Sequence, residues 1–166
     1  MNNPKIKFTI ANYGEIIAEL YPEKAPKTVE NFLSLVKDGF FEGLIFHRVI
    51  SGFMIQGGGF DIDFNQKKAN AIKGEFAANG FRENDLRHTR GVLSMARTMD
   101  PNSASSQFFI MHKDAPHLDR QYAGFGLVVE GIEVVDKIAA VRTTSRGWYD
   151  DVPTDPVVIE KVEIIE

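Results

Sequence analysis

The sequence predicts a single, mainly β domain, and three observations support this prediction. Short stretches of alternating apolar residues recur along the chain, separated by glycine, asparagine and proline. Only two segments show the apolar spacing of a helix. The 166 residues match the usual size of one domain, and no linker or repeat divides them, so we expect one domain over 1–166. Such strands build a sandwich or a barrel, and periodicity alone leaves both open.

The chain opens with a predicted β-hairpin. Residues 5–10 alternate strictly between polar and apolar, which places Ile6, Phe8 and Ile10 on one face of a strand. Asparagine and glycine then supply the composition of a turn before a second strand over 15–21.

Two helices are predicted. Apolar residues recur at helical spacing from Val29 to Val36, and Gly39 follows as a C-terminal cap. A second run of the same spacing extends from Ile132 to Ala139.

The other expected strands are short and bounded by glycine or proline. They cover residues 44–50, 53–56, 91–95, 107–111 and 158–164. The polar segment 61–90 is expected to form long loops that carry short strand pieces.

Composition excludes several classes of protein. The net charge of −4 argues against a dedicated nucleic-acid binder, and the lack of cysteine removes disulfides and thiolate ligands. The N-terminal residues lack the apolar run of a signal peptide, and no stretch is long enough to span a membrane. We therefore expect a cytoplasmic protein that acts without a membrane. The absence of a heptad seam favours a monomer.

Four histidines raise the question of a metal site or an acid–base catalyst. Their spacing matches no zinc motif, so we expect no metal and no organic cofactor. His47 and His88 are expected to satisfy nearby backbone groups. Trp148, the one tryptophan, is expected to pack near the turn at Gly147. The glycines at 57–59 lack the Lys and Ser/Thr of a phosphate-binding loop.

Three blocks of sequence carry a resemblance to a known family. The first is FHRVISGFMIQGG at 46–58, the second combines GVLSMA at 91–96 with SQFFI at 106–110, and the third pairs Leu118-Asp119 with Phe125-Gly126. Together they resemble the cyclophilins, the cyclosporin-binding class of peptidyl-prolyl cis-trans isomerases, and the compact form with its insertion at 100–102 is similar to bacterial members. The resemblance extends over nearly the whole chain.

This resemblance implies a fold and an activity. The implied fold is a closed eight-stranded antiparallel β-barrel capped by two α-helices, which favours barrel over sandwich. The implied activity is to accelerate rotation of X-Pro peptide bonds in proteins and peptides, and so to assist protein folding. Such an enzyme needs no covalent chemistry, because it has only to favour the twisted bond over both planar forms.

The family pattern assigns roles to eleven residues. Arg48 and Gln56 match the catalytic positions, since a guanidinium offers a rigid fork of donors and stays charged. Phe53, Met54, Phe109 and Leu118 match an apolar slot for the proline ring. The remaining positions matched to substrate binding are Ala96, Arg97, Gln107, His117 and Tyr122.

Three of these positions depart from relatives. Many relatives carry Asn where Arg97 stands, so this side chain either shifts substrate preference or extends into solvent. His117 replaces a Trp, and Tyr122 replaces a His, of the eukaryotic proteins best known for binding cyclosporin. Cyclosporin-like cyclic peptides are therefore expected to bind with reduced affinity, because a large apolar surface and an indole donor are lost.

Two alternatives belong to other classes. A non-catalytic module could use the same groove to bind proline-containing segments as a scaffold or holding chaperone. A hydrolase would need an activated nucleophile next to a base, and no serine lies in such a motif. The joint presence of Arg48, Gln56 and the apolar slot favours an enzyme that acts on proline-containing polypeptides.

Overall fold

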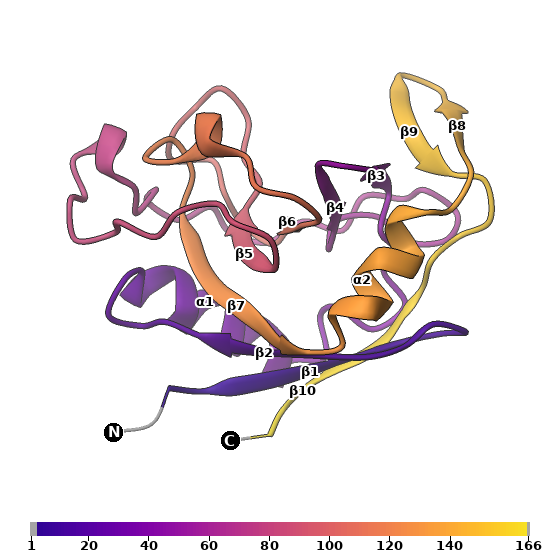
Figure 1. The fold of residues 1–166 in the computed structure, drawn as a ribbon, viewed down its shortest axis with the longest axis horizontal. Coiled ribbons are helices and arrows are strands. Elements are labelled where there is room, and N and C mark those ends of the chain that lie inside the picture. Colours follow the sequence, from indigo (N-terminus) through magenta and orange to yellow (C-terminus); the bar gives the residue numbers. More distant parts are fainter. Residues whose placement is uncertain (1–2, 166) are drawn as a thin grey trace.

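Eight strands form one curved antiparallel sheet in the computed structural model, which describes residues 3–165 (Figure 1). The order across the sheet is β10-β1-β2-β7-β5-β6-β4-β3. Residues 1–2 and 166, included in the predicted domain, lie outside the described residues. The strands of this sheet are β1 (Lys5–Ile10), β2 (Gly14–Leu20), β3 (Arg48–Ile50), β4 (Met54–Gly57), β5 (Val92–Met95), β6 (Phe108–Met111), β7 (Gly124–Glu130) and β10 (Ile159–Ile164).

The curvature of the sheet creates an enclosed core. Strands β1, β2 and β10 lie across from β3–β6, and the long strand β7 joins the two halves (Figure 1). Aromatic rings fill the space between the halves: Phe8 and Phe108 have centroids 5.4 Å apart, and Phe32 lies 5.1 Å from Phe125. All four are fully buried. Close packing of large apolar side chains is the main stabilisation that a cysteine-free chain has available.

The prediction of a closed barrel is wrong, because the sheet is an open half-barrel. Its edge strands are β3 and β10, which do not pair with each other. Near these edges Ile45 and Val158 form only an isolated bridge, supported by the backbone bond from Phe46 N to Val157 O at 3.0 Å. The backbone bonds to the start of β10 at Ile159 come from Gly43 and Leu44, which precede β3, so β3 itself does not pair with β10.

Both predicted helices are confirmed. Helix α1 covers Pro26–Lys37 and packs against β10, and helix α2 covers Ile132–Ala139 and packs against β2, β3 and β4. Gly39 has φ +68°, a left-handed conformation that glycine adopts without steric cost, as expected just after a helix end. No helix within residues 3–165 is both long and apolar enough to cross a lipid bilayer.

The loops differ from the prediction in detail. The segment 61–90 was expected to contain strand pieces, but among its described residues the only regular element is a 3-10 helix, η1 (Ala77–Asn79). A second 3-10 helix, η2 (Pro116–Leu118), precedes β7. Gly58 shows why glycines follow β4: it has φ +90°, and a Cβ there would lie 2.8 Å from the carbonyl oxygen of Ser106. A larger residue would push these segments apart.

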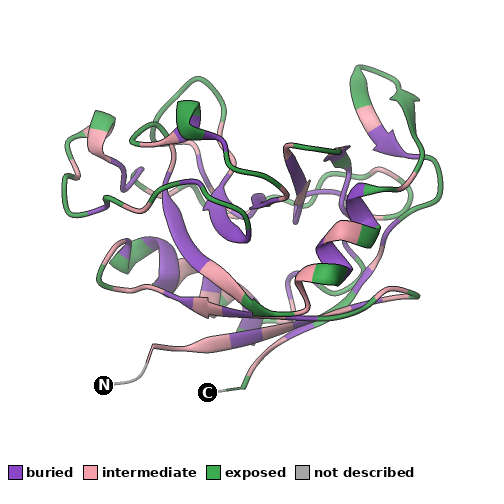
Figure 2. Cartoon of the chain, viewed as in Figure 1, coloured by how far each residue is buried: buried purple, intermediate pink, exposed green. Residues whose placement is uncertain are grey.

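A separate hairpin was not anticipated. Strands β8 (Thr143–Arg146) and β9 (Tyr149–Pro153) form their own two-stranded sheet, which projects from the body at the upper right of Figure 1. Most of this hairpin is exposed (Figure 2). The expected packing of Trp148 is wrong, because its exposed fraction is 99%. Trp148 lies in the two-residue loop between the paired residues Arg146 and Tyr149.

Candidate functional site

Strand alternation places polar and apolar groups together on the outer face of the sheet. In β4, Ile55 joins the main core, whereas Met54 and Gln56 point to the other face. The antiparallel register sets Arg48 of β3 opposite Gln56, and Gln56 opposite Phe109 of β6. A cation, an amide and an aromatic ring therefore lie side by side across three neighbouring strands.

A second hydrophobic cluster supports this outer face. It is separate from the main core and consists of Met54, Val92, Phe109, Met111, Ala115 and Leu118. Each of these residues is at least 93% buried. Side chains packed in this way keep their rotamers, so the floor beneath the outer face is rigid.

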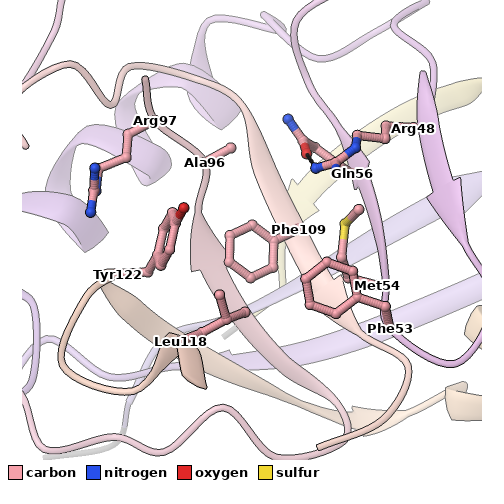
Figure 3. Close-up of a pocket in the computed structure, with 9 residues that line it drawn as sticks. All are labelled: Arg48, Phe53, Met54, Gln56, Ala96, Arg97, Phe109, Leu118 and Tyr122. Carbon is pink, nitrogen blue, oxygen red and sulfur yellow. Dashed lines mark hydrogen bonds between the residues drawn. The ribbon is translucent and has the colours of Figure 1, made fainter. Parts of the chain in front are cut away.

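A pocket of about 130 Å³ opens above this floor (Figure 3). Figure 3 shows the Phe109 ring at the centre, with Arg48 and Gln56 on one side and Tyr122 and Arg97 on the other. The pocket is lined by Arg48, Phe53, Met54, Gln56, Ala96, Arg97, Phe109, Leu118 and Tyr122. These are nine of the eleven residues that the sequence assigned to the site.

Polar side chains form a chain of hydrogen bonds at one end of the pocket. Arg48 Nη1 donates to Gln56 Oε1 at 3.4 Å, and Gln56 Nε2 donates to Gln107 Oε1 at 3.1 Å. Arg48 is exposed, and this is the one hydrogen bond that its guanidinium makes within residues 3–165. Four of its five N–H donors therefore stay available to a bound molecule.

Arg97 is held in place at the other end of the pocket. Its guanidinium carbon lies 4.6 Å from the ring centroid of Tyr122 and 4.9 Å from that of Phe76. Arg97 Nη2 also donates to the carbonyl oxygen of Gln121 at 2.7 Å. The side chain does not extend into solvent, because two aromatic faces and the carbonyl hold it against the loop that carries Tyr122.

Two assigned residues do not line the pocket. Gln107 reaches it only through its bond with Gln56, and borders a neighbouring polar depression. His117 is exposed, and its ring stacks on that of Phe53 with centroids 5.7 Å apart. His117 therefore lies at the rim behind Phe53.

His88 is a part of the site that the sequence did not reveal. Its buried ring lies 3.1 Å from Asp119 Oδ1 through Nδ1 and 2.8 Å from Ser94 Oγ through Nε2. It also stacks on Phe109, with centroids 6.1 Å apart. Burial lowers the pKa of His88, although the Asp119 carboxylate opposes this shift. The polar segment around His88 has no periodicity that could have predicted these partners.

His47 differs from its prediction as well. Its Nδ1 atom is buried and finds no hydrogen-bond partner within residues 3–165. Burial, with a smaller effect from the charge of Arg48, lowers the pKa of His47 to about 4. Within the same residues no three histidine, aspartate or glutamate side chains gather as a metal-binding group.

Comparison with known proteins identifies the family. The model of the cyclophilin type peptidyl-prolyl cis-trans isomerase family matches residues 5–164. The chain belongs to the cyclophilin family. Among curated cyclophilin relatives, a peptidyl-prolyl cis-trans isomerase of Acinetobacter baylyi is 50% identical over 92% of this chain and 81% of its own length. Peptidyl-prolyl cis-trans isomerase B of Escherichia coli is 46% identical over 93% of this chain and 96% of its own.

Solved structures show the same cyclophilin fold. A crystal structure of a cyclophilin type isomerase from Cryptosporidium parvum matches with a TM-score of 0.82 at 29% identity, covering 99% of this chain and 98% of that one. The same protein in the presence of the dipeptide Ala-Pro matches with a TM-score of 0.80 at 30% identity, covering 98% and 99%. Membership of the cyclophilins, and similarity to bacterial ones, confirm the resemblance found in the sequence.

Proposed function

We propose that this protein catalyses cis-trans isomerisation of X-Pro peptide bonds in polypeptides, with Arg48 as the residue that acts on the bond and Gln56 as the catalytic-site residue that positions it. The observation that carries the proposal is the position of the Arg48 guanidinium, largely free of internal bonds, beside an apolar pocket floored by Phe109. The isomerase names of the bacterial relatives and the Ala-Pro dipeptide of a solved cyclophilin support it.

The chemistry needs a donor near the proline nitrogen. Rotation about a peptide bond is opposed by about 18–20 kcal/mol, because planarity delocalises the nitrogen lone pair. In the twisted state the lone pair is localised on the proline nitrogen, which can then accept a hydrogen bond. In both planar forms the lone pair is delocalised, so the nitrogen is a poorer acceptor. A guanidinium that donates to it stabilises the twisted state selectively, and selective stabilisation lowers the barrier.

The apolar pocket meets a second requirement of the reaction, which is to hold the ring of the substrate proline. A cavity of about 130 Å³ lined by Phe53, Met54, Phe109 and Leu118 suits a proline ring and little more. With the ring fixed, the acyl side of the bond turns. Ala96 and Gln107, which both border the neighbouring polar depression, then serve the peptide backbone on that side, and Arg97 with Tyr122 limits the far end of the pocket.

The test is the cis-to-trans rate of an Ala-Pro tetrapeptide with wild type and Arg48→Ala. We expect kcat/KM to fall by about a hundredfold, a loss of about 3 kcal/mol of transition-state stabilisation, and Arg48→Lys to recover it only in part. Circular dichroism should show unchanged folding, since Arg48 is exposed. If wild type binds the peptide without accelerating rotation, the groove belongs to a non-catalytic proline-binding module.

Weak binding of cyclosporin-like cyclic peptides is part of the same proposal. His117 stacks on Phe53 but offers less apolar surface than an indole. We expect His117→Trp to tighten cyclosporin binding by about tenfold, roughly 1.4 kcal/mol, with tetrapeptide turnover unchanged. Calorimetric titration of both proteins with cyclosporin tests this prediction, and equal affinities would contradict it.

The monomeric state and the cytoplasmic location stay predictions. Analytical sedimentation tests the first, and cell fractionation tests the second.

A further inference from the structure

The β8–β9 hairpin lies next to the catalytic edge of the sheet. It packs against β3, the short edge strand that begins with Arg48 (Figure 1). The ring of Tyr149, the first residue of β9, has its centroid 6.4 Å from that of His47, the neighbour of Arg48 in the chain. The hairpin therefore extends the molecular surface on the Arg48 side of the pocket.

Both residues that flank the hairpin loop are anchored to the body of the protein. Arg146 and Tyr149 are paired across the hairpin, and both contact Phe64. The Arg146 guanidinium lies 4.6 Å from the Phe64 ring centroid, and the Tyr149 ring lies 5.2 Å from the rings of Phe64 and Phe60. These contacts connect both ends of the loop to Phe64, and through Tyr149 to the buried Phe60.

The anchored loop presents one large apolar side chain to water. It consists of Gly147, with φ +61°, and Trp148, and glycine at the first position of a two-residue hairpin loop is typical of a type II′ turn. Trp148 is 99% exposed, and Ile62, from the loop that carries Phe64, is 52% exposed. Single exposed apolar residues are common, but a tryptophan in a loop held by aromatic contacts, on a hairpin that packs against the strand of Arg48, has the features of an interface anchor.

A polypeptide substrate has to pass beyond the pocket. The cavity of about 130 Å³ holds one proline ring, so the residues that flank the proline lie on the surrounding surface. Strand β9 packs against β3, has five residues and measures about 17 Å, which is the length of about five extended substrate residues. A substrate flank that leaves the pocket on the Arg48 side runs toward the hairpin, because β9 packs against the strand that begins with Arg48.

We infer that Trp148, presented by the β8–β9 hairpin, is a secondary binding site for an apolar flank of the polypeptide whose proline occupies the pocket. This inference rests on the proposed function and adds to it a substrate class. Extended or unfolded chains with aromatic or aliphatic residues several positions from the proline are bound more tightly than short peptides. Trp148 contributes to binding and takes no part in the bond rotation.

The kinetic test compares Trp148→Ser with wild type on four probes that lack tryptophan. The first is an Ala-Pro tetrapeptide, and the others are peptides of about 20 residues, which span about 65 Å when extended. One carries Phe and Leu before the proline, one carries them after it, and one has only Ser and Gly flanks. We expect kcat/KM to fall about fivefold to tenfold for one apolar-flanked peptide, through KM, and to change less than twofold for the other probes.

Two controls make the result specific. Ile165→Ser removes another exposed apolar side chain, 42% exposed, near the end of the chain and far from the hairpin, and should leave all four rates unchanged (Figure 1). Because Trp148 is the one tryptophan of the chain, its fluorescence reports directly on this site. We expect a shift to shorter wavelength with the apolar-flanked peptide and none with the tetrapeptide.

Each outcome has a distinct meaning. The inference is overturned if Trp148→Ser slows all probes equally or none of them, or if saturating apolar-flanked peptide leaves the emission unchanged. Failure of the proposed function would instead appear as a wild type that accelerates no probe. The fluorescence titration would still measure binding at Trp148 in that case, so the two failures are distinguishable.

Discussion

Gln56 illustrates how one side chain can serve catalysis through another. It sits opposite Arg48 in the register of β3 and β4, accepts a bond of 3.4 Å from it, and donates one of 3.1 Å to Gln107. The longer bond lies near the limit for a hydrogen bond, so it restricts the guanidinium only moderately. At the scale of residues, Arg48 carries the electrostatic effect, and Gln56 directs it.

The corresponding prediction concerns Gln56→Ala. We expect kcat/KM on the tetrapeptide to fall about tenfold, less than for Arg48→Ala, because the guanidinium remains but loses its orienting partner. The double variant should be little worse than Arg48→Ala alone, since residues that act as a unit are not additive. If the loss in the double variant equals the sum of the two single losses in transition-state stabilisation, Gln56 contacts the substrate independently of Arg48.

At the scale of elements, helix α1 depends on a residue far away in the sequence. Its N-cap is Ala25, whose side chain has no hydrogen-bonding group. Glu75 takes over this role from the loop before η1: its carboxylate accepts from the backbone N–H of Thr28 at 2.7 Å, from the Thr28 hydroxyl at 2.7 Å, and from the N–H of Lys27 at 3.2 Å. Glu75 is 3% exposed, so water cannot replace it.

We therefore predict that Glu75→Ala lowers the free energy of unfolding by about 2–4 kcal/mol, because it leaves buried donors at the helix terminus unsatisfied. Glu75→Gln should lose about half as much, since its amide oxygen still accepts. Urea unfolding followed by circular dichroism measures both changes. The control is Glu83→Ala, which changes an exposed glutamate in the segment after η1 and should stay within about 0.5 kcal/mol of wild type.

At the scale of the whole molecule, buried histidines make stability depend on pH. The pKa of His47 is about 4 in the folded protein, against 6.5 when unfolded. Above pH 6.5 both states are neutral there, so His47 adds no pH dependence. Between pH 6.5 and 4 only the unfolded state takes up the proton, which favours unfolding by up to about 3 kcal/mol. The lowered pKa of His88 acts with the same sign.

His47→Phe should remove this dependence. The apolar ring suits a position bordered by Phe60, Phe64 and Tyr149, and it eliminates the unpartnered Nδ1. At pH 7.5 we expect the free energy of unfolding of the variant to lie within about 1 kcal/mol of that of wild type. Between pH 7.5 and about pH 4.5 the difference should shift by about 2 kcal/mol in favour of the variant. Unfolding curves of wild type, His47→Phe and the surface control His117→Phe test this. If the free energy of unfolding falls with pH in the same way for all three proteins, His47 is not the source of the pH dependence.

Sequence alone determined the features that depend on short-range pattern. Apolar spacing predicted both helices and the opening hairpin, because periodicity is a local property of the chain. The family motifs also predicted nine of the residues that line the pocket. Several of these residues lie on strands, where strict alternation decides which side chains face outward. Strand β7 and the β8–β9 hairpin escaped prediction, because neither has a strict alternation of polar and apolar residues.

Only the tertiary structure decided how distant segments meet. In the folded chain the sheet stays open between β3 and β10, and Glu75 lies at the start of α1. His88 contacts Ser94 and Asp119, and Trp148 is exposed to water. None of these follows from local propensity, since each depends on free energies of contact between residues far apart in the chain. Burial and hydrogen-bond partners are set by what packs against a side chain, and that is known only once the chain has folded.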